Sequence, residues 1–188
     1  LSKFDAGINY EIYEKMGAKH MTLSGVEGVN FSVWAPEAMR VSVVGDFNLW
    51  DGRRNQMNKL GDFGVYELFI PGLKVGDLYK FEIKTMKGEP MLKADPYAFY
   101  SELRPNTASI VADISGFEWG DEDWMKNREV FQSTETDKSP AMNIYELHLG
   151  SWIRKEMQYD ENGEEVNGSV FYNYREIAPK LATYVKKM

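Results

Sequence analysis

The sequence has no cysteine and only two histidines, His20 and His148, among its 188 residues. Without cysteine there can be no disulfide, no thiol nucleophile and no thiolate-held zinc, and the composition fits a reducing compartment, so we expect a cytoplasmic protein. A histidine-based metal centre would need both histidines together with carboxylates. No stretch has metal-ligand spacing or the glycine pattern of a nucleotide-binding loop, and we therefore expect neither a metal nor any other cofactor.

Positive charge and long apolar runs are also scarce. The formal net charge is −7, whereas nucleic-acid binding needs a basic surface. No stretch approaches the roughly 20 apolar residues of a membrane helix, and the first residues lack the pattern of a signal peptide. We therefore expect neither nucleic acid nor membrane as a partner, and the acidic, aromatic-rich composition fits a neutral ligand such as a sugar. The sequence begins at Leu1 and stops at Met188 inside a helical pattern, so we expect a fragment.

Short segments of alternating apolar and polar residues dominate the first two thirds of the sequence. In the clearest of them Tyr79, Phe81 and Ile83 alternate with lysine and glutamate. Strands are predicted at residues 29–33, 41–44, 65–70, 78–84 and 107–111. Glycine, proline and aspartate turns separate them without intervening helices, which favours a mainly β, immunoglobulin-like antiparallel β-sandwich. Trp34, the tryptophan inside a strand pattern, is expected in its core.

Helical periodicity is found at both ends of the sequence. Residues 5–16 carry apolar side chains at every fourth position, which predicts a short helix. Residues 173–188 form a second helical pattern that opens with the capping-box spacing of Asn173 and Glu176, and Pro179 should kink this helix or delay its start. A strand is predicted before it at residues 143–150, where Glu146 and His148 share a face and are expected to form a structural pair.

These patterns divide the sequence into four parts. Residues 1–20 are an N-terminal helical segment and residues 21–115 are the β-sandwich. Residues 116–141 are a polar linker, whose two tryptophans we expect to pin it to a neighbouring surface. Residues 142–188 form one strand–loop–helix unit of an α/β architecture, and one such unit cannot bury its own apolar faces.

The turn at residues 45–53 (GDFNLWDGR) is the most informative stretch. It places Trp50 among polar neighbours, where an indole either packs against the protein or is offered to a ligand. A sugar ring presents a flat C–H face bordered by hydroxyls, which an indole and nearby hydrogen-bonding groups can match. Asn48 in the same turn and Lys80 on the polar face of its strand are the candidate hydroxyl contacts, so the candidate glycan-binding residues are Trp50, Asn48 and Lys80.

Several segments together resemble a known family. In sequence order they are 31–36 (FSVWAP), the turn at 45–53, 67–73 (ELFIPGL), 79–83 (YKFEI) and 93–98 (KADPYA). They resemble the N-terminal family 48 carbohydrate-binding module of glycogen branching enzymes. The segment 144–152 (IYELHLGSW) is similar to the first strand of the glycoside hydrolase family 13 barrel of those enzymes, a (β/α)8 barrel that would be incomplete here. The barrel segment favours branching enzymes over debranching enzymes and glycogen-sensing kinase subunits, which share the module.

The resemblance implies a parent enzyme that cuts an α-1,4-glucan and transfers the segment to form α-1,6 branches by a retaining mechanism. The two carboxyl groups of such a mechanism lie, in the family, on later barrel strands. We therefore expect no catalytic residue in this sequence and no activity from it, with α-glucan and the parent's own catalytic domain as partners.

The role of Trp50 stays open between two alternatives. In related glycogen-sensing modules the equivalents of Trp50 and Lys80 contact glucan, together with a second tryptophan shortly after the strand. Residues 86–90 contain no such tryptophan, so a site with one aromatic platform should bind weakly. Alternatively the module is purely structural and Trp50 docks on the catalytic domain, with Arg53 and Arg54 pairing with acids across that interface; for a branching enzyme this alternative is slightly preferred.

Overall fold

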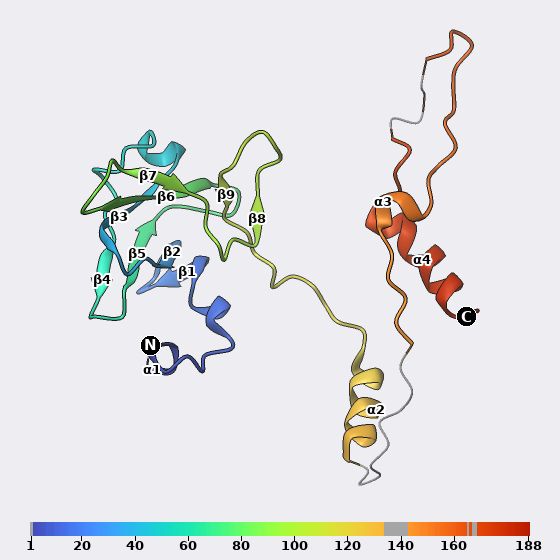
Figure 1. Ribbon diagram of the computed structural model, residues 1–188, viewed down its shortest axis with the longest axis horizontal. Helices are drawn as coiled ribbons and strands as arrows, with labels where there is room; N and C mark the ends of the chain where they lie inside the picture. The colour runs from blue at the N-terminus through green and yellow to red at the C-terminus, as the bar shows by residue number, and fades with distance from the viewer. Residues whose placement is uncertain (1, 134–142, 165, 167–168) are drawn as a thin grey trace. The chain divides into compact units, whose positions relative to one another are not determined.

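The computed structural model describes residues 2–133, 143–164, 166 and 169–188 (Figure 1). The chain divides into two compact units, Leu1–Gly120 and Asp121–Met188. Unit 1 contains all of the β-strands in the described residues, and unit 2 is helical with irregular connections. None of the described helices is long and apolar enough to cross a membrane.

Unit 1 is built from two sheets in which every strand pair is antiparallel. The first sheet has the order β1 (Gly17–Leu23), β2 (Val26–Trp34), β5 (Val65–Pro71) and β4 (Asn58–Leu60). The second has the order β3 (Ala38–Val44), β6 (Leu78–Thr85), β9 (Ser109–Ile110) and β8 (Tyr100–Ser101), and β7 (Met91–Lys93) also pairs with β6. The strands predicted within unit 1 are all present, whereas β1, β4, β7 and β8 were not predicted.

The two sheets pack face to face around one apolar core. In β2 the side chains of Val29, Phe31 and Val33 point inward and are almost fully buried. The ring of Phe31 meets the ring of Tyr79 in β6 edge to face, with centroids 5.0 Å apart, which joins one sheet to the other. Such aromatic pairs add about 0.5–1.5 kcal/mol to the contribution of burial itself. The expected antiparallel β-sandwich is therefore confirmed.

The N-terminal helix predicted at residues 5–16 is wrong. The structure has only a short helix α1 (Ser2–Asp5) and a single 3-10 turn, η1 (Ile12–Glu14). Gly7 adopts a left-handed backbone with φ of 67°, which ends any helical path, and Ile8 is left 56% exposed. Of the periodic apolar positions only Met16 is fully buried, and β1 begins at the next residue.

Trp34 is not in the core, contrary to the sequence-based expectation. It is 55% exposed, because it continues the outward-facing side of β2 while its neighbour Val33 points inward. Its indole Nε1 donates a hydrogen bond of 3.2 Å to the carbonyl of Phe63. The ring also packs edge to face against Phe4 of the N-terminal segment, with centroids 6.1 Å apart. Trp34 thus holds surface segments to the outside of the first sheet.

Unit 2 contains the helices α2 (Glu122–Ser133), α3 (Leu149–Trp152) and α4 (Tyr174–Val185). Helix α2 occupies part of the expected linker, so that segment is not irregular throughout, and residues 134–141 of the linker lie outside the described residues. The strand predicted at residues 143–150 is wrong. Residues 143–148 have no strand partner in the described part of unit 2, and residues 149–152 form α3.

The capping box of α4 is confirmed. The Glu176 backbone N–H donates to Asn173 Oδ1 at 3.0 Å, and the Asn173 N–H donates to Glu176 Oε2 at 2.9 Å. Helix α4 starts at Tyr174, directly after its N-cap Asn173, with Pro179 inside it, so the proline does not delay the start. Trp119 is 75% and Trp124 60% exposed, and the expected role of these linker tryptophans stays a prediction.

Candidate functional site

The turn after β3 folds back over the outer face of the second sheet. Along β3, Val41 and Val43 point into the core, so Ser42 and Val44 point outward, yet both are completely buried. The turn covers them. Its 3-10 segment η2 (Asp46–Asn48) follows β3 directly, and residues 55–57 return beside β3, where the Met57 N–H donates to the Val41 carbonyl at 2.8 Å.

Gly52 fixes how closely this turn approaches the sheet. A Cβ atom at Gly52 would lie 2.0 Å from Glu82 Oε1, which is on the outward face of β6. The Glu82 carboxylate also pairs with the guanidinium of Arg40 on β3. The turn therefore lies directly against the Arg40–Glu82 pair, and a side chain at position 52 would displace the Glu82 carboxylate or the turn itself.

The side chain of Asn48 stabilises the turn from inside through hydrogen bonds. It is only 2% exposed, and its Oδ1 accepts from the Gly45 N–H at 3.1 Å. Its Nδ2 donates to the Val43 carbonyl at 2.9 Å and to Asn55 Oδ1 at 2.8 Å. Both polar atoms are thus engaged inside the protein, so the expected direct contact between Asn48 and a sugar does not fit the structure. Its amide shapes the turn instead.

Leu49 and Trp50 adopt left-handed backbone conformations, with φ of 59° and 58°. For residues with a Cβ atom each such conformation costs about 1 kcal/mol or more, and such strain persists only where the surroundings enforce it. Here the Trp50 N–H donates to the Gly45 carbonyl at 2.9 Å, and the indole Nε1 donates to Asp46 Oδ1 at 2.8 Å. The indole is half-buried and held at its nitrogen edge by a carboxylate.

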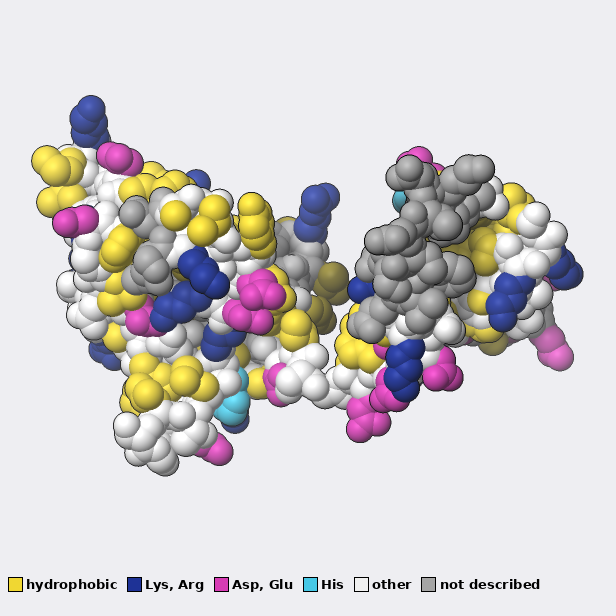
Figure 2. Space-filling view, turned by 90° about the horizontal axis from the view of Figure 1, so that it is seen from below, with side chains coloured by type: hydrophobic (Ala, Val, Ile, Leu, Met, Phe, Trp, Pro, Cys, Tyr) yellow, Lys and Arg dark blue, Asp and Glu magenta, His cyan; other side chains and the backbone are white. Residues whose placement is uncertain are grey.

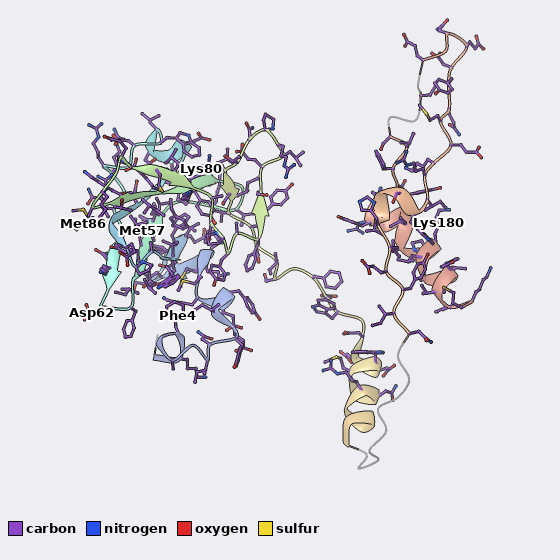
Figure 3. All side chains as sticks on the ribbon, in the orientation of Figure 1. Phe4, Met57, Asp62, Lys80, Met86 and Lys180 are labelled. Atoms are coloured by element: carbon purple, nitrogen blue, oxygen red, sulfur yellow. The ribbon has the colours of Figure 1, made fainter. Side chains whose placement is uncertain are left out.

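Lys80 lies next to the start of this turn, because it pairs with Val44 across β3 and β6 (Figure 3). The side chain of Lys80 is half-buried, and its Nζ donates a hydrogen bond of 2.7 Å to Thr107 Oγ1 in the connection from β8 to β9. Neither Thr107 nor Asp46 was predicted from the sequence. Asp46 lies four positions before Trp50 in the same turn, whereas only the pairing of β6 with β9 brings Thr107 close to Lys80.

The two arginines that follow Trp50 pair within their own turn. Arg53 Nε donates to Asp51 Oδ1 at 2.8 Å and Arg53 Nη2 donates to Asp51 Oδ2 at 2.8 Å, while Arg54 Nε lies 3.8 Å from Asp51 Oδ2. The hydrogen bond from Arg53 holds the pKa of the Asp51 carboxyl well below its usual range. Asp51 therefore pairs with Arg53 inside the turn, and the expectation that these arginines pair with acids across an interface stays a prediction.

These groups together form a surface suited to a neutral polyhydroxyl ligand. The indole of Trp50 with its Asp46 partner, and the ammonium group of Lys80 with its Thr107 partner, lie on the outer side of the second sheet, and each offers a contact that a sugar can use. The arrangement is thus one that could bind a sugar. The described residues also contain no group of three side chains that could hold a metal ion.

Asp95 is the buried carboxyl group of unit 1, and it has a structural environment. Burial raises its pKa, while hydrogen bonds from the Tyr79 hydroxyl at 2.6 Å to Oδ2 and from the Tyr97 N–H at 2.8 Å to Oδ1 act in the opposite direction. The Asp95 N–H donates to Ser109 Oγ at 2.9 Å. These bonds fasten the segment after β7 to β6 and β9, inside the sandwich and away from the surface of Trp50.

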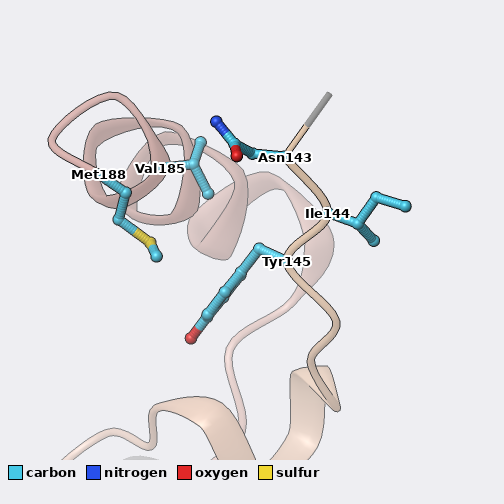
Figure 4. A pocket seen from close by; sticks show the side chains of 5 residues that line it. All are labelled: Asn143, Ile144, Tyr145, Val185 and Met188. Carbon is cyan, nitrogen blue, oxygen red and sulfur yellow. The ribbon is translucent and has the colours of Figure 1, made fainter. Parts of the chain in front are cut away.

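Unit 2 holds an open cavity of about 570 Å³ between the segment after residue 142 and the end of α4. It is lined by Asn143, Ile144, Tyr145, Val185 and Met188 (Figure 4). Its walls are mostly apolar and lack converging charged groups. The expected pair of Glu146 and His148 does not form: Glu146 is exposed, and His148 Nδ1 lies 3.0 Å from Ser151 Oγ.

Comparison with known families gives one match within unit 1. Residues 15–98 match the family described as carbohydrate-binding module 48 (isoamylase N-terminal domain). The matched residues include the turn, Trp50 and Lys80, and they end before β8 and β9.

Comparison with curated proteins extends the similarity to nearly the whole chain. The 1,4-alpha-glucan branching enzyme GlgB of Thermosynechococcus vestitus is 48% identical over 98% of this chain, which covers 25% of that enzyme. The GlgB enzymes of Protochlamydia amoebophila and Synechocystis sp. are 50% and 48% identical, and 24% and 25% of their lengths are covered. The chain thus spans about a quarter of the length of these relatives, and the expected resemblance to branching enzymes is confirmed. Among solved structures, pullulanase type I from Bacillus subtilis str. 168, complexed with maltose, is 28% identical over 55% of the chain and 14% of its own, with a TM-score of 0.43.

Proposed function

We propose, on the premise that residues 15–98 are a carbohydrate-binding module 48 domain in a chain related to branching enzymes, that the surface around Trp50 and Lys80 binds α-glucan. The observation that carries this proposal is the turn around Trp50, whose backbone is strained and held in place by hydrogen bonds from Asn48 and to Asp46. A protein that needed only to cover Val44 could do so without two consecutive left-handed residues. The strain is explained if binding requires the indole of Trp50 to be held in this position.

Each group of the surface has a role in this proposal. The Trp50 ring stacks on the C–H face of a glucose unit, with its nitrogen edge fixed by Asp46. Lys80 donates to a hydroxyl of the same or the next unit, and Thr107 holds Lys80 in place. Asn48 contributes indirectly by keeping the turn closed. The pairing of Arg53 with Asp51 inside the turn favours this reading over docking at a charged interface.

Affinity electrophoresis in glycogen-containing gels tests the proposal on the 188-residue chain. Glycogen should retard the wild-type chain, and Trp50→Ala should remove most of the retardation. Trp119→Ala is the matched control, because Trp119 is 75% exposed and contacts only the Phe117 ring among the described aromatic residues. Equal migration of the wild-type chain with and without glycogen would count against binding.

At the level of the whole protein, we propose that this chain serves a branching enzyme that forms α-1,6 branches from α-1,4-glucan. The support is its identity of 44–50% to GlgB enzymes, of which it spans about a quarter. In this proposal the chain supplies binding and orientation, while the catalytic carboxyl groups are elsewhere in the enzyme.

A second role, contact with the catalytic domain, is favoured by the outer face of the first sheet. By register this face carries Met21, Leu23 and Val26, which are 39%, 48% and 49% exposed. The space-filling view shows hydrophobic side chains grouped at the surface of unit 1 on the side seen from below (Figure 2). If the catalytic domain covers this face, Val26→Lys should lower the melting temperature of a full-length branching enzyme and leave that of the 188-residue chain unchanged. Equal effects on both would contradict this role.

A further inference from the structure

The ring of Tyr100 is an exposed aromatic group on the last strand of the second sheet. Tyr100 is 61% exposed and lies in β8, which pairs with β9, and β9 pairs in turn with β6. It lies beyond residues 15–98, which match the carbohydrate-binding module. The adjacent residue, Phe99, points the other way, because the ammonium group of Lys19 from the first sheet lies 3.8 Å from its ring centre.

The strand register places Tyr100 on the same face of the sheet as Lys80. Residues directly opposite each other across antiparallel strands have side chains on the same face. Leu78 is opposite Ile110, and Ile110 is opposite Tyr100, so these three form one row across β6, β9 and β8. The next residue of β6, Tyr79, is buried in the core, so this row faces outward, as does Lys80 two positions after Leu78.

The spacing of the row suits a chain molecule. Neighbouring strands are about 4.8 Å apart, so Tyr100 lies about 10 Å across the sheet from Leu78. Leu78 and Ile110 are half-buried and give an apolar floor between Tyr100 and Lys80. The bond from Lys80 Nζ to Thr107 Oγ1 ties the connection between β8 and β9 to β6, which fixes the two ends of this surface relative to each other.

We propose that Tyr100 is a second aromatic contact for the α-glucan bound at Trp50 and Lys80, so that the surface holds a stretch of several glucose units. This inference rests on the glucan-binding function proposed above. The sequence lacks a second tryptophan at residues 86–90, where Met86 is 80% exposed. The sheet supplies an aromatic ring from another strand instead. A glucan is the occupant that fits, because the apolar side chains of Leu78 and Ile110 lie between the ring of Tyr100 on one side and the Lys80 ammonium group, with its Thr107 hydroxyl partner, on the other.

Titration calorimetry with maltoheptaose and maltotriose on the 188-residue chain tests the inference. Tyr100→Ala should weaken maltoheptaose binding about five- to tenfold, a size expected for truncating one aromatic contact, and should change maltotriose binding less than twofold. Tyr100→Phe keeps the ring and should bind both like the wild type. Tyr10→Ala is the control, because Tyr10 is 87% exposed and lies in the N-terminal segment, outside both sheets.

The two proposals fail in different ways. If Trp50→Ala weakens both ligands while Tyr100→Ala binds maltoheptaose like the wild type, the inference about Tyr100 is wrong and the proposed function stands. An equal loss of both ligands in Tyr100→Ala would also contradict the inference, because a contact for the distant end should spare maltotriose. If the wild type binds neither ligand, or Trp50→Ala binds like the wild type, the proposed function is wrong and the inference with it.

Discussion

At the scale of single residues, Asn48 and Trp50 have different roles in the turn after β3. The buried amide of Asn48 closes the turn with three hydrogen bonds, and this closure brings Trp50 into its left-handed conformation. Composition alone suggests that both residues contact the ligand, since asparagine and tryptophan are both common in sugar sites. Burial separates them: only the indole can reach a ligand.

Replacing Asn48 should therefore affect stability and binding together. Asn48→Ala leaves the Val43 carbonyl and the Gly45 N–H without these partners in a buried place, so it should reduce the free energy of unfolding by about 2–3 kcal/mol. Urea unfolding followed by circular dichroism measures this loss. Asn58→Ala, at an exposed position of β4, should stay within about 0.5 kcal/mol of the wild type. A similar stability of Asn48→Ala and the wild type would contradict the fastening role.

At the scale of elements, Glu67 connects the N-terminal segment to the outer face of the first sheet. Its carboxylate accepts from Lys15 Nζ before β1, from Asn30 Nδ2 at 2.9 Å and from Ser32 Oγ at 3.2 Å. Burial alone would raise the pKa of Glu67, but these bonds outweigh it and lower the pKa below its ordinary value. The ionised carboxylate of Glu67 thus connects the N-terminal segment, β2 and β5.

The lowered pKa predicts a definite pH dependence. A carboxyl group with a lowered pKa stabilises the folded state at pH values above its unfolded pKa of about 4.3, and this contribution is lost as the pH falls through the folded pKa. Glu67→Gln should therefore be less stable than the wild type at pH 7, and the difference should shrink as the pH falls towards 3. Urea midpoints at several pH values measure it, with Glu89→Gln at an exposed position as the control. A difference that grows on acidification would contradict this account.

At the scale of the whole molecule, the described parts of the chain contain a β-sandwich, on which we propose a glucan-binding surface, and a helical unit. A (β/α)8 barrel takes about 250 residues, whereas unit 2 spans residues 121–188. In an incubation with amylose, followed by the fall in iodine absorbance, the 188-residue chain should form no branches. The GlgB enzyme of Thermosynechococcus vestitus is the positive control. Branch formation by the chain itself would overturn the proposal that it only binds and orients.

The sequence predicted the sandwich because period-two alternation reports directly which side of a strand is buried. The strands β2, β3, β5 and β6 were found in this way. It missed β8, which is only two residues long and too short to show an alternating pattern, and which is defined by its pairing with β9. The prediction of a helix at residues 5–16 relied on the spacing of apolar residues and ignored Gly7, whose left-handed backbone interrupts the helix. The prediction of a strand at residues 143–150 was wrong because a strand forms only beside a hydrogen-bonded neighbouring strand. Trp50 and Lys80 were proposed as site residues from their residue types and positions, whereas the burial of Asn48 and the hydrogen bond between Thr107 and Lys80 depend on the fold.

The central claim is that Trp50 meets the glucan, and the indole N–H signals of the chain report on it most directly. The sequence has five tryptophans, and each gives one indole signal in a two-dimensional ¹H–¹⁵N spectrum. With Trp50→Phe to identify its signal, titration with maltoheptaose should shift the Trp50 signal progressively and leave those of Trp34, Trp119, Trp124 and Trp152 in place. A Trp50 signal that stays fixed at saturating maltoheptaose, or a shift confined to another tryptophan, would contradict the account.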